Sequence, residues 1–591
     1  MMVSQKNMSR SYTALAFLII AAALVLVYFT VSQKSQTTDE AVHLASGYSY
    51  WATGDFRMNP EHPALVKDIA AIPLLFFHLD SKTDGPYFDQ AHLWDFGPQV
   101  IYHNNKPGQE ILMAGRTMML LFFALLGVIV YFWAKKLYGA KTALVVLFFT
   151  MTCEVILGHA GLVTTDVPIS FAFLFTCFTL TRFFQNPTKK TFAWFSLAFS
   201  LVLLVKYSAL VVGVVIAVIA IAHSLLHNES FKGKFLKRFA ADLLSRKVVP
   251  LICSLAIAIV VIIVCYGGGT KKIYESIDTD SARVVHEFVA ARSPQEQKLL
   301  NWVGNNVPVV AFDYWEGMVS VLTHNEGGHT TAFLGEISNR GWWYYFPVVF
   351  LFKTSLADLA ITVGAVAAGA SYIALTFLRA KKSRFKAFWQ RLQQTRFDFI
   401  VLAIAPAIFF AISMNSRLNL GLRYVLPIYP FIFLFAGTFL KYFVTKKYLR
   451  PVLVAVMGFS LYTTIHAFPN YLAFFNPFSW GNGVTPENIT IDSNIDWGQD
   501  LTTLKKYMDQ NHIDSIYLRY FGTADPAFYG IKTRYFPSLQ EIKNGMDVSG
   551  YVAVSASWYA QPDDQYQWVH LQKPVAVLDN SIFIMNFEHV K

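Results

Sequence analysis

Two adjacent carboxylates, Asp39 and Glu40, follow the first long apolar run of this 591-residue sequence by only a few positions. At the boundary of an apolar region a carboxylate is partly desolvated, which makes it a better base for proton transfer. The alternative is structural: Asp39 would cap the start of a helix, because acidic residues are common in the first helical turn. The pair alone is compatible with both general-base chemistry and capping.

A third acid, Asp166, lies within Thr164-Thr165-Asp166-Val167-Pro168, where a later apolar run begins. An acid at a membrane boundary either caps the helix that starts there or binds a cation or a hydroxyl group. Both interpretations stand on the sequence alone.

Basic residues also lie at the ends of apolar runs, namely Arg116, Lys206, Lys353 and Arg423. As a set they would suit a phosphate or diphosphate head group, since Arg and Lys neutralise it and hydrogen-bond to its oxygens. Each one singly could instead reach toward the interface, as long basic side chains do near the ends of membrane helices. A lipid-phosphate site therefore requires that the fold bring these residues together.

The elements that must position these residues are membrane helices. The sequence is 54% hydrophobic and 15% charged, against about 25% charged in a typical soluble domain. This composition excludes an ordinary soluble enzyme. Runs of about 20 apolar residues are typical of transmembrane helices. We predict an all-α polytopic membrane protein with about eleven transmembrane helices, at 11–31, 111–134, 142–158, 166–184, 191–206, 208–225, 248–266, 355–378, 398–414, 424–444 and 451–467.

The net charge of +11 comes from Lys and Arg residues in short loops between the apolar runs. This pattern indicates positive-inside topology and not nucleic-acid binding. The predicted cytoplasmic loops are 135–141, 182–190, 232–247, 379–396 and 446–450. With the N-terminus inside, three large polar segments then lie outside, at 33–110, 267–345 and 468–591.

These segments define the expected domains. Residues 1–467 form a transmembrane domain with large outer loops, and residues 468–591 form a small extracytoplasmic α/β domain. In the first outer loop we expect amphipathic helices along the membrane face at 41–51 and 64–77. In the tail we expect a helix over Leu501–Gln510 and strands at 515–520, 551–555 and 581–587.

The sequence resembles the lipid-carrier-dependent glycosyltransferases of the C-type fold, which include protein O-mannosyltransferases and lipid A aminoarabinose transferases. The order of the matching motifs, and their positions relative to the apolar runs, make the resemblance specific over about residues 12 to 500. The motifs are Asp39-Glu40, Gly54-Asp55-Phe56, Glu61-His62-Pro63-Ala64-Leu65, Thr165-Asp166-Val167-Pro168, the segment 419–427 and the segment 492–500.

The resemblance implies inverting transfer of a monosaccharide from a polyprenyl-phosphate carrier to an acceptor hydroxyl on the outer face of the membrane. The acceptor would be a protein, a lipid or a glycan. Asp39 would be the general base, Glu40 would position it, and Asp166 would help to hold the acceptor side. Cations would stabilise the leaving phosphate. The candidates are Lys67, Arg116, Lys206, Arg340 and Arg423.

Two departures from the family pattern matter. Some relatives have Lys-Pro-Pro where this chain has His62-Pro63-Ala64, so the phosphate-facing cation would be His62, with a charge that depends on pH. Trp342-Trp343-Tyr344 lacks the acid of the Trp-Trp-Asp motif of oligosaccharyltransferases. This favours a monosaccharide carrier over asparagine-linked transfer.

No cofactor is required by these motifs, and a divalent metal is left open. Glu61, His62 and His329 are the candidate ligands, although the sequence has no HxxxH or HExxH spacing. The rival function is a transporter or flippase of lipid-linked sugars, which would also need many spans and intramembrane charges. A binding or scaffolding protein that uses its tail is a third reading. For a glycosyltransferase with this topology we expect the bacterial cytoplasmic membrane, with the C-terminus outside.

Overall fold

The computed structural model describes residues 2–227, 242–276, 292–379, 391–479, 485–561 and 563–590, together with the single positions 240, 289, 290 and 389. Parts of three predicted loops, 232–247, 267–345 and 379–396, lie outside these residues.

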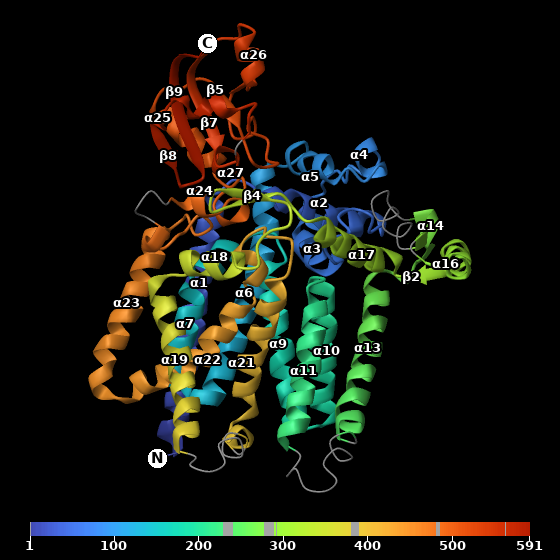
Figure 1. Cartoon of the computed structure of the whole chain (residues 1–591), viewed down its shortest axis with the longest axis vertical. Coiled ribbons are helices and arrows are strands. Elements are labelled where there is room, and N and C mark those ends of the chain that lie inside the picture. Colours follow the sequence, from blue (N-terminus) through green and yellow to red (C-terminus); the bar gives the residue numbers. More distant parts are fainter. Residues whose placement is uncertain are drawn as a thin grey trace.

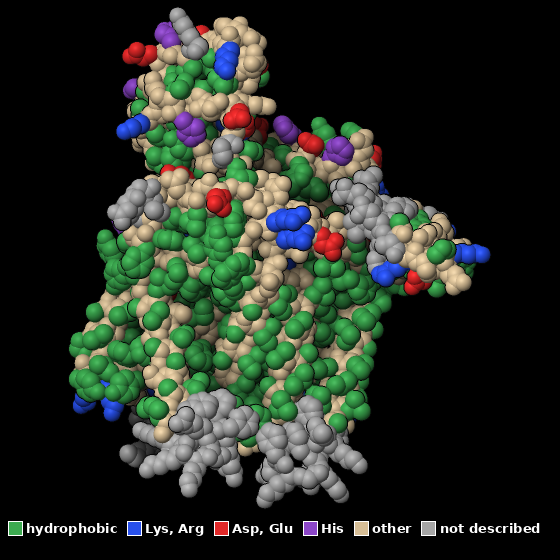
Figure 2. All heavy atoms as spheres, viewed as in Figure 1, with side chains coloured by type: hydrophobic (Ala, Val, Ile, Leu, Met, Phe, Trp, Pro, Cys, Tyr) green, Lys and Arg blue, Asp and Glu red, His purple; other side chains and the backbone are tan. Residues whose placement is uncertain are grey.

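A bundle of long helices with roughly parallel axes forms the body of the molecule (Figure 1). Within the described residues, eight helices are long and apolar enough to cross a membrane. Their side chains form a broad hydrophobic band, and most of the charged side chains in view lie above or below it (Figure 2). The chain is a multi-pass integral membrane protein. A helix occupies each of the eleven predicted runs: α1 (Met2–Ser32), α6 (Gly108–Tyr138), α7 (Ala140–Thr152) with α8 (Glu154–Ala160), α9 (Asp166–Gln185), α10 (Lys189–Val205), α11 (Ala209–His227), α13 (Val249–Cys265), α19 (Leu356–Arg379), α21 (Phe397–Ser413), α22 (Ile428–Thr445) and α23 (Arg450–Ala467).

The predicted span at 142–158 is not one continuous helix. Helices α7 and α8 meet at 61°, because Cys153 between them has an extended backbone. The freed carbonyl of Thr152 accepts a hydrogen bond of 2.8 Å from the hydroxyl of Thr464 on α23, and such a substitute partner stabilises a break in a buried helix. Three further predicted spans are occupied by helices of 17 residues each, α10, α13 and α21.

Shorter helices lie across one end of the bundle, which we call the capped end. They are α2 (Thr38–Thr53), α3 (Ala64–Ala71), α5 (Leu93–Tyr102), α17 (Phe312–Gly327) and α18 (Tyr345–Lys353) (Figure 1). Helix α2 was predicted to lie amphipathically on the membrane face, but most of its residues are buried. At Gly47 a Cβ atom would lie 2.1 Å from the carbonyl oxygen of Lys67 on α3. Only glycine therefore permits the observed approach of α2 to α3.

The tail forms a five-stranded mixed sheet above the capped end, in the order β6-β5-β7-β9-β8. Side chains of β7 and β9 alternate between two hydrophobic clusters, as the period of a strand requires. Helix α25 (Leu501–Gln510) packs in one of these clusters, and it has the bounds expected from the sequence. The strands are β5 (Ile516–Arg519), β6 (Thr533–Arg534), β7 (Val548–Ser555), β8 (Ala576–Leu578) and β9 (Ile582–Val590).

Candidate functional site

Two acids and two cations meet at the capped end of the bundle. Arg423 Nη1 lies 3.0 Å from Asp39 Oδ2 and 3.9 Å from Asp166 Oδ2. Lys206 Nζ lies 2.7 Å from Asp166 Oδ1. We call these four residues the acid–cation cluster. They come from α2, the start of α9, the α10–α11 connection and the turn η3 (Leu422–Val425), so the fold unites residues that are far apart in the sequence.

Exposure distinguishes the two acids of the cluster. The side chain of Asp39 is 20% exposed, whereas that of Asp166 is 1% exposed. Asp39 is therefore accessible from outside the protein, whereas Asp166 is enclosed and pairs with Lys206 and Arg423. Burial alone would lower the pKa of Arg423, but the carboxylates of Asp39 and Asp166 raise it. The guanidinium thus keeps its charge.

Asp39 is not needed to cap helix α2, because Thr37 and Glu40 make the capping contacts. Thr37 is the N-cap of α2, and the Glu40 carboxylate accepts a hydrogen bond of 2.9 Å from the Thr37 N–H in a capping box. Glu40 also accepts a hydrogen bond of 3.0 Å from the N–H of Val163. Glu40 thus satisfies the start of the helix, and the carboxylate of Asp39 is left for another role.

Glu40 is held by Arg116 in the interior of the protein. The guanidinium makes two hydrogen bonds to the carboxylate, at 2.9 and 2.6 Å, and both side chains are 0% exposed. Burial alone would raise the pKa of Glu40, but Arg116 and the backbone donors lower it. Glu40 therefore stays ionised, and it is a weak proton acceptor, because its pKa is lowered and both its oxygens already accept hydrogen bonds.

The structure gives Arg116 a role different from the predicted phosphate contact. Its remaining donors bind the carbonyl oxygens of Val31, Lys34 and Ser35, at 2.6, 2.9 and 2.8 Å. A guanidinium has five N–H donors, and here each has an acceptor. Arg116 thus ties the end of α1 to the start of α2, and it has no donor left for a phosphate.

Lys67 also makes hydrogen bonds in the interior. Its ammonium donates to the hydroxyl of Tyr50 at 2.8 Å and to the carbonyl of Asn59 at 2.7 Å. The residue is 1% exposed, and this burial lowers the pKa of Lys67 to about 7. It packs α3 against α2 and does not open onto the acid–cation cluster. Lys353 likewise donates to the carbonyls of Leu472 and Asn494 in the interior.

His62 packs against His43 of α2, with ring centroids 4.8 Å apart. Burial, together with the nearby His43 and cationic side chains, lowers the pKa of His62 well below 6.5. This direction favours the neutral ring, and a contact of His62 with phosphate stays a prediction. Burial likewise lowers the pKa of His43 to about 4.

The three candidate metal ligands do not converge. Glu61 pairs with His324 at 3.2 Å, and His329 contacts the other nitrogen of His324 at 3.4 Å, whereas the ring of His62 lies against His43. In the part of the chain that the structure describes, no group of three or more His, Cys, Asp or Glu side chains is arranged to hold a metal ion.

Arg340, the remaining predicted cation, is exposed in the loop between β4 (Glu336–Ser338) and α18. Its backbone N–H donates to the hydroxyl of Ser338 at 3.1 Å. Among the described residues its side chain has no ion pair. It does not contact the acid–cation cluster in this conformation.

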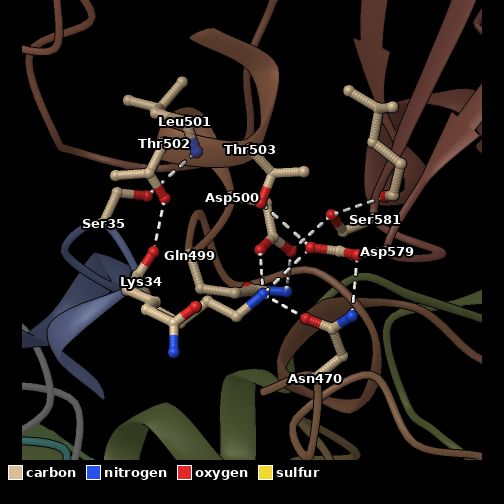
Figure 3. A network of polar contacts seen from close by, with 12 residues as sticks. Lys34, Ser35, Asn470, Gln499, Asp500, Leu501, Thr502, Thr503, Asp579 and Ser581 are labelled. Atoms are coloured by element: carbon tan, nitrogen blue, oxygen red, sulfur yellow. Dashed lines mark hydrogen bonds and ion pairs between the residues drawn. The ribbon is translucent and has the colours of Figure 1, made fainter. Parts of the chain in front are cut away.

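The tail is joined to the first loop by a buried polar network (Figure 3). Figure 3 shows the ammonium of Lys34 lying among Asp500, Asp579 and Asn470. Lys34 Nζ is 2.6 Å from Asp500 Oδ1 and 3.0 Å from Asp579 Oδ2. In addition, the N–H of Ser35 donates to the carbonyl of Gln499 at 2.9 Å. The segment that precedes Asp39 is therefore fixed by residues of the tail.

Sequence reasoning assigned no role to individual residues of the segment 492–500. In the structure, the indole ring of Trp497 packs against the guanidinium of Arg423, and Asp492 is partly buried, with φ of 60°. Burial raises the pKa of Asp492, although the charge of Arg423 opposes this effect. The sequence shows a cluster of acids around Trp497, but it does not show that Arg423 is the residue that contacts this tryptophan.

Comparisons with known proteins bear on this site. Residues 109–265 match the family described as dolichyl-phosphate-mannose-protein mannosyltransferase. No curated protein matches the sequence significantly. Crystal structures of ArnT from Cupriavidus metallidurans, bound to undecaprenyl phosphate and in the apo state, each align with 97% of this chain and 98% of their own. Their identity is 11%, and their TM-scores are 0.43 and 0.42.

The oligosaccharyltransferase of Archaeoglobus fulgidus, in complex with zinc and sulfate, aligns with 91% of this chain and 68% of its own, at 10% identity and a TM-score of 0.38. The family match at 109–265 covers α6 to α13 and includes Asp166 and Lys206 of the acid–cation cluster. This match agrees with the resemblance drawn from the motifs, and residues 109–265 are similar to the mannosyltransferase family that uses a lipid-phosphate-linked sugar.

Proposed function

We propose that this protein transfers a monosaccharide from a polyprenyl-phosphate carrier to an acceptor hydroxyl at the capped end of the bundle, with inversion at the anomeric carbon. The observation that carries the proposal is the partly exposed carboxylate of Asp39 in contact with Arg423, at the junction between the membrane helices and the cap. The matched family description, which names a lipid-phosphate-linked mannose, supports this class of donor.

In the proposed step, Asp39 accepts the proton of the acceptor hydroxyl as that oxygen forms a bond to the anomeric carbon. The bond from the anomeric carbon to the phosphate oxygen breaks, and its electron pair leaves with the phosphate. Attack on the side opposite the leaving group inverts the configuration. Arg423 binds Asp39 Oδ2, so Oδ1 is the oxygen that meets the acceptor.

The leaving phosphate needs positive charge, because a phosphate dianion develops as the bond breaks. Lys206 and Arg423 are the cations best placed to supply it, since both lie in the acid–cation cluster. Asp166 balances their charge while the site is empty of donor. Arg340 is a further candidate because its exposed side chain can turn toward a bound lipid.

We expect the cap to face the outside of a bacterial cytoplasmic membrane, since the loops at the opposite end are basic. A protein, lipid or glycan hydroxyl would then approach between the cap helices and the tail. No metal is needed for the proposed step.

The test is transfer of radiolabelled sugar from polyprenyl-phosphate monosaccharides in proteoliposomes that contain the full chain. Asp39→Asn should abolish transfer, because an amide cannot accept the proton. Asp80→Asn is a matched control, since Asp80 lies in the same loop and only pairs with Lys82 on the surface. Full transfer by Asp39→Asn would refute the assignment of the base. Movement of labelled carrier across the bilayer without transfer would favour the transporter alternative.

A further inference from the structure

We infer that Trp497, which follows the last bundle helix, is a positioning residue that holds Arg423 against Asp39. The inference rests on the proposed function, because it gives Trp497 a part in that reaction. It also makes the segment 492–499 a component of the active site and not merely a linker to the tail sheet.

The indole ring is the first line of evidence. The guanidinium carbon of Arg423 lies 4.1 Å from the ring centroid of Trp497, and Trp497 is 2% exposed. Tryptophan is the strongest aromatic partner for a cation, and the interaction strengthens when both groups are desolvated. A planar guanidinium stacked on an indole loses freedom to rotate, so the direction of its N–H donors becomes fixed.

The backbone of the same residue holds the other half of the ion pair. The carbonyl oxygen of Trp497 accepts hydrogen bonds from the N–H of Thr38 at 2.9 Å and from its hydroxyl at 3.2 Å. Thr38 immediately precedes Asp39. Trp497 thus contacts both the residue that carries the proposed base and the cation bound to that base.

The segment around Trp497 also fixes the turn that carries Arg423. The N–H of Leu422 donates to the side-chain oxygen of Asn494 at 2.9 Å, and the hydroxyl of Ser493 donates to the carbonyl of Leu420 at 2.5 Å. Gly421, between these two contacts, has φ of 114°, which strongly favours glycine. The segment 492–499 therefore makes hydrogen bonds both to the turn that carries Arg423 and to the first residue of α2.

A change at Trp497 should act on the chemical step more than on donor binding. Without the indole, Arg423 can shift from Asp39 toward Asp166, whose Oδ2 is 3.9 Å away and has no hydrogen-bond partner among the described residues. The geometry of the base would then be lost, while Lys206 would still bind the phosphate. Misplacement of a catalytic group lowers kcat without a matching rise in KM.

The experiment compares Trp497→Leu and Trp497→Phe with the wild type in the proteoliposome transfer assay. Trp497→Leu should lower kcat about 10- to 30-fold, as expected for loss of a desolvated cation–π contact, with KM for the donor changed less than about twofold. Trp497→Phe should recover most of the rate, because a benzene ring keeps a π face. The matched control is Trp558→Leu, since Trp558 lies 4.7 Å from the guanidinium carbon of Arg519 in the tail.

The outcomes separate the two claims. Transfer by the wild type with an unchanged kcat in Trp497→Leu refutes the inference and leaves the proposed function intact. An equal loss in Trp497→Phe and Trp497→Leu, or an equal loss in Trp558→Leu, also refutes it, because a general structural defect would then explain the result. No transfer by the folded wild type from any polyprenyl-phosphate sugar refutes the proposed function, and the inference falls with it.

Discussion

Replacing Arg116 with lysine separates a structural role for this cation from a role in donor binding. The substitution keeps the positive charge but offers three donors where arginine offers five. All five donors of Arg116 have acceptors, two on Glu40 and three on backbone carbonyls. At least two buried acceptors must therefore lose their partner in Arg116→Lys.

The cost follows from this count. A hydrogen bond that involves a charged group contributes about 1.5 to 3 kcal/mol to stability, so two lost bonds cost about 3 to 6 kcal/mol. This is a large share of the roughly 5 to 15 kcal/mol that stabilises a typical folded domain. We expect a clear fall in the midpoint of thermal unfolding in detergent, measured by intrinsic fluorescence.

The control and the kinetics complete the test. Arg57→Lys should change the midpoint little, because the Arg57 side chain is 45% exposed in its pair with Asp55 and exposed pairs contribute about 1 kcal/mol or less. The fraction of Arg116→Lys that stays folded should keep the wild-type KM for the donor. A variant with unchanged thermal stability but a large rise in KM would refute the structural role and restore Arg116 as a phosphate ligand.

Two further perturbations test the connection of the tail and the response to pH. Lys34→Met leaves the buried carboxylate of Asp500 and the partly buried carboxylate of Asp579 without their cation. This loss should cost about 3 to 5 kcal/mol and speed limited proteolysis of the tail. Lys505→Met removes a surface ion pair on α25 and should leave the rate of proteolysis unchanged. Equal proteolysis of the two variants would contradict the role of Lys34. The pKa of His43 falls from 6.5 to about 4 on folding, so the unfolded chain binds a proton first as the pH drops. Between pH 6.5 and 4 the wild type should lose about 3 kcal/mol of its free energy of unfolding. The variant His43→Asn should lose less over the same pH range. If the unfolding midpoints of both proteins fall equally as the pH drops, His43 is not the cause of the acid sensitivity.

The helices of the bundle could be predicted because the thickness of a bilayer sets the length of an apolar run. Helix α25 was predictable to the residue, since its apolar positions recur with helical spacing. The break at Cys153 was not, because no proline or glycine marks it in residues 140–157. Its stabilising partner, Thr464, lies 312 residues away in the sequence.

For the candidate site, too, some features could be predicted from the sequence and others could not. The types and positions of Asp39, Asp166 and Arg423 indicated a charged site, and the fold brings these three residues together. The role of Arg116 could not be read, because the sequence gives the place of a charge but not its acceptors. The lowered pKa of His62 depends on the groups packed around its ring, which are also a property of the tertiary structure.

The contact of Lys34 with Asp579 spans 545 positions of the chain, and this span has a consequence for how the protein is made. Ribosomes add about 5 to 20 residues per second, so the first loop must wait roughly half a minute to two minutes for its last partner to emerge. During that interval the ammonium of Lys34 and the approach to Asp39 lack their final covering. A truncated or stalled chain would therefore insert its helices and still lack the contacts that fix the segment before Asp39, so the acid–cation cluster is complete only after the last residues of the chain have been synthesised.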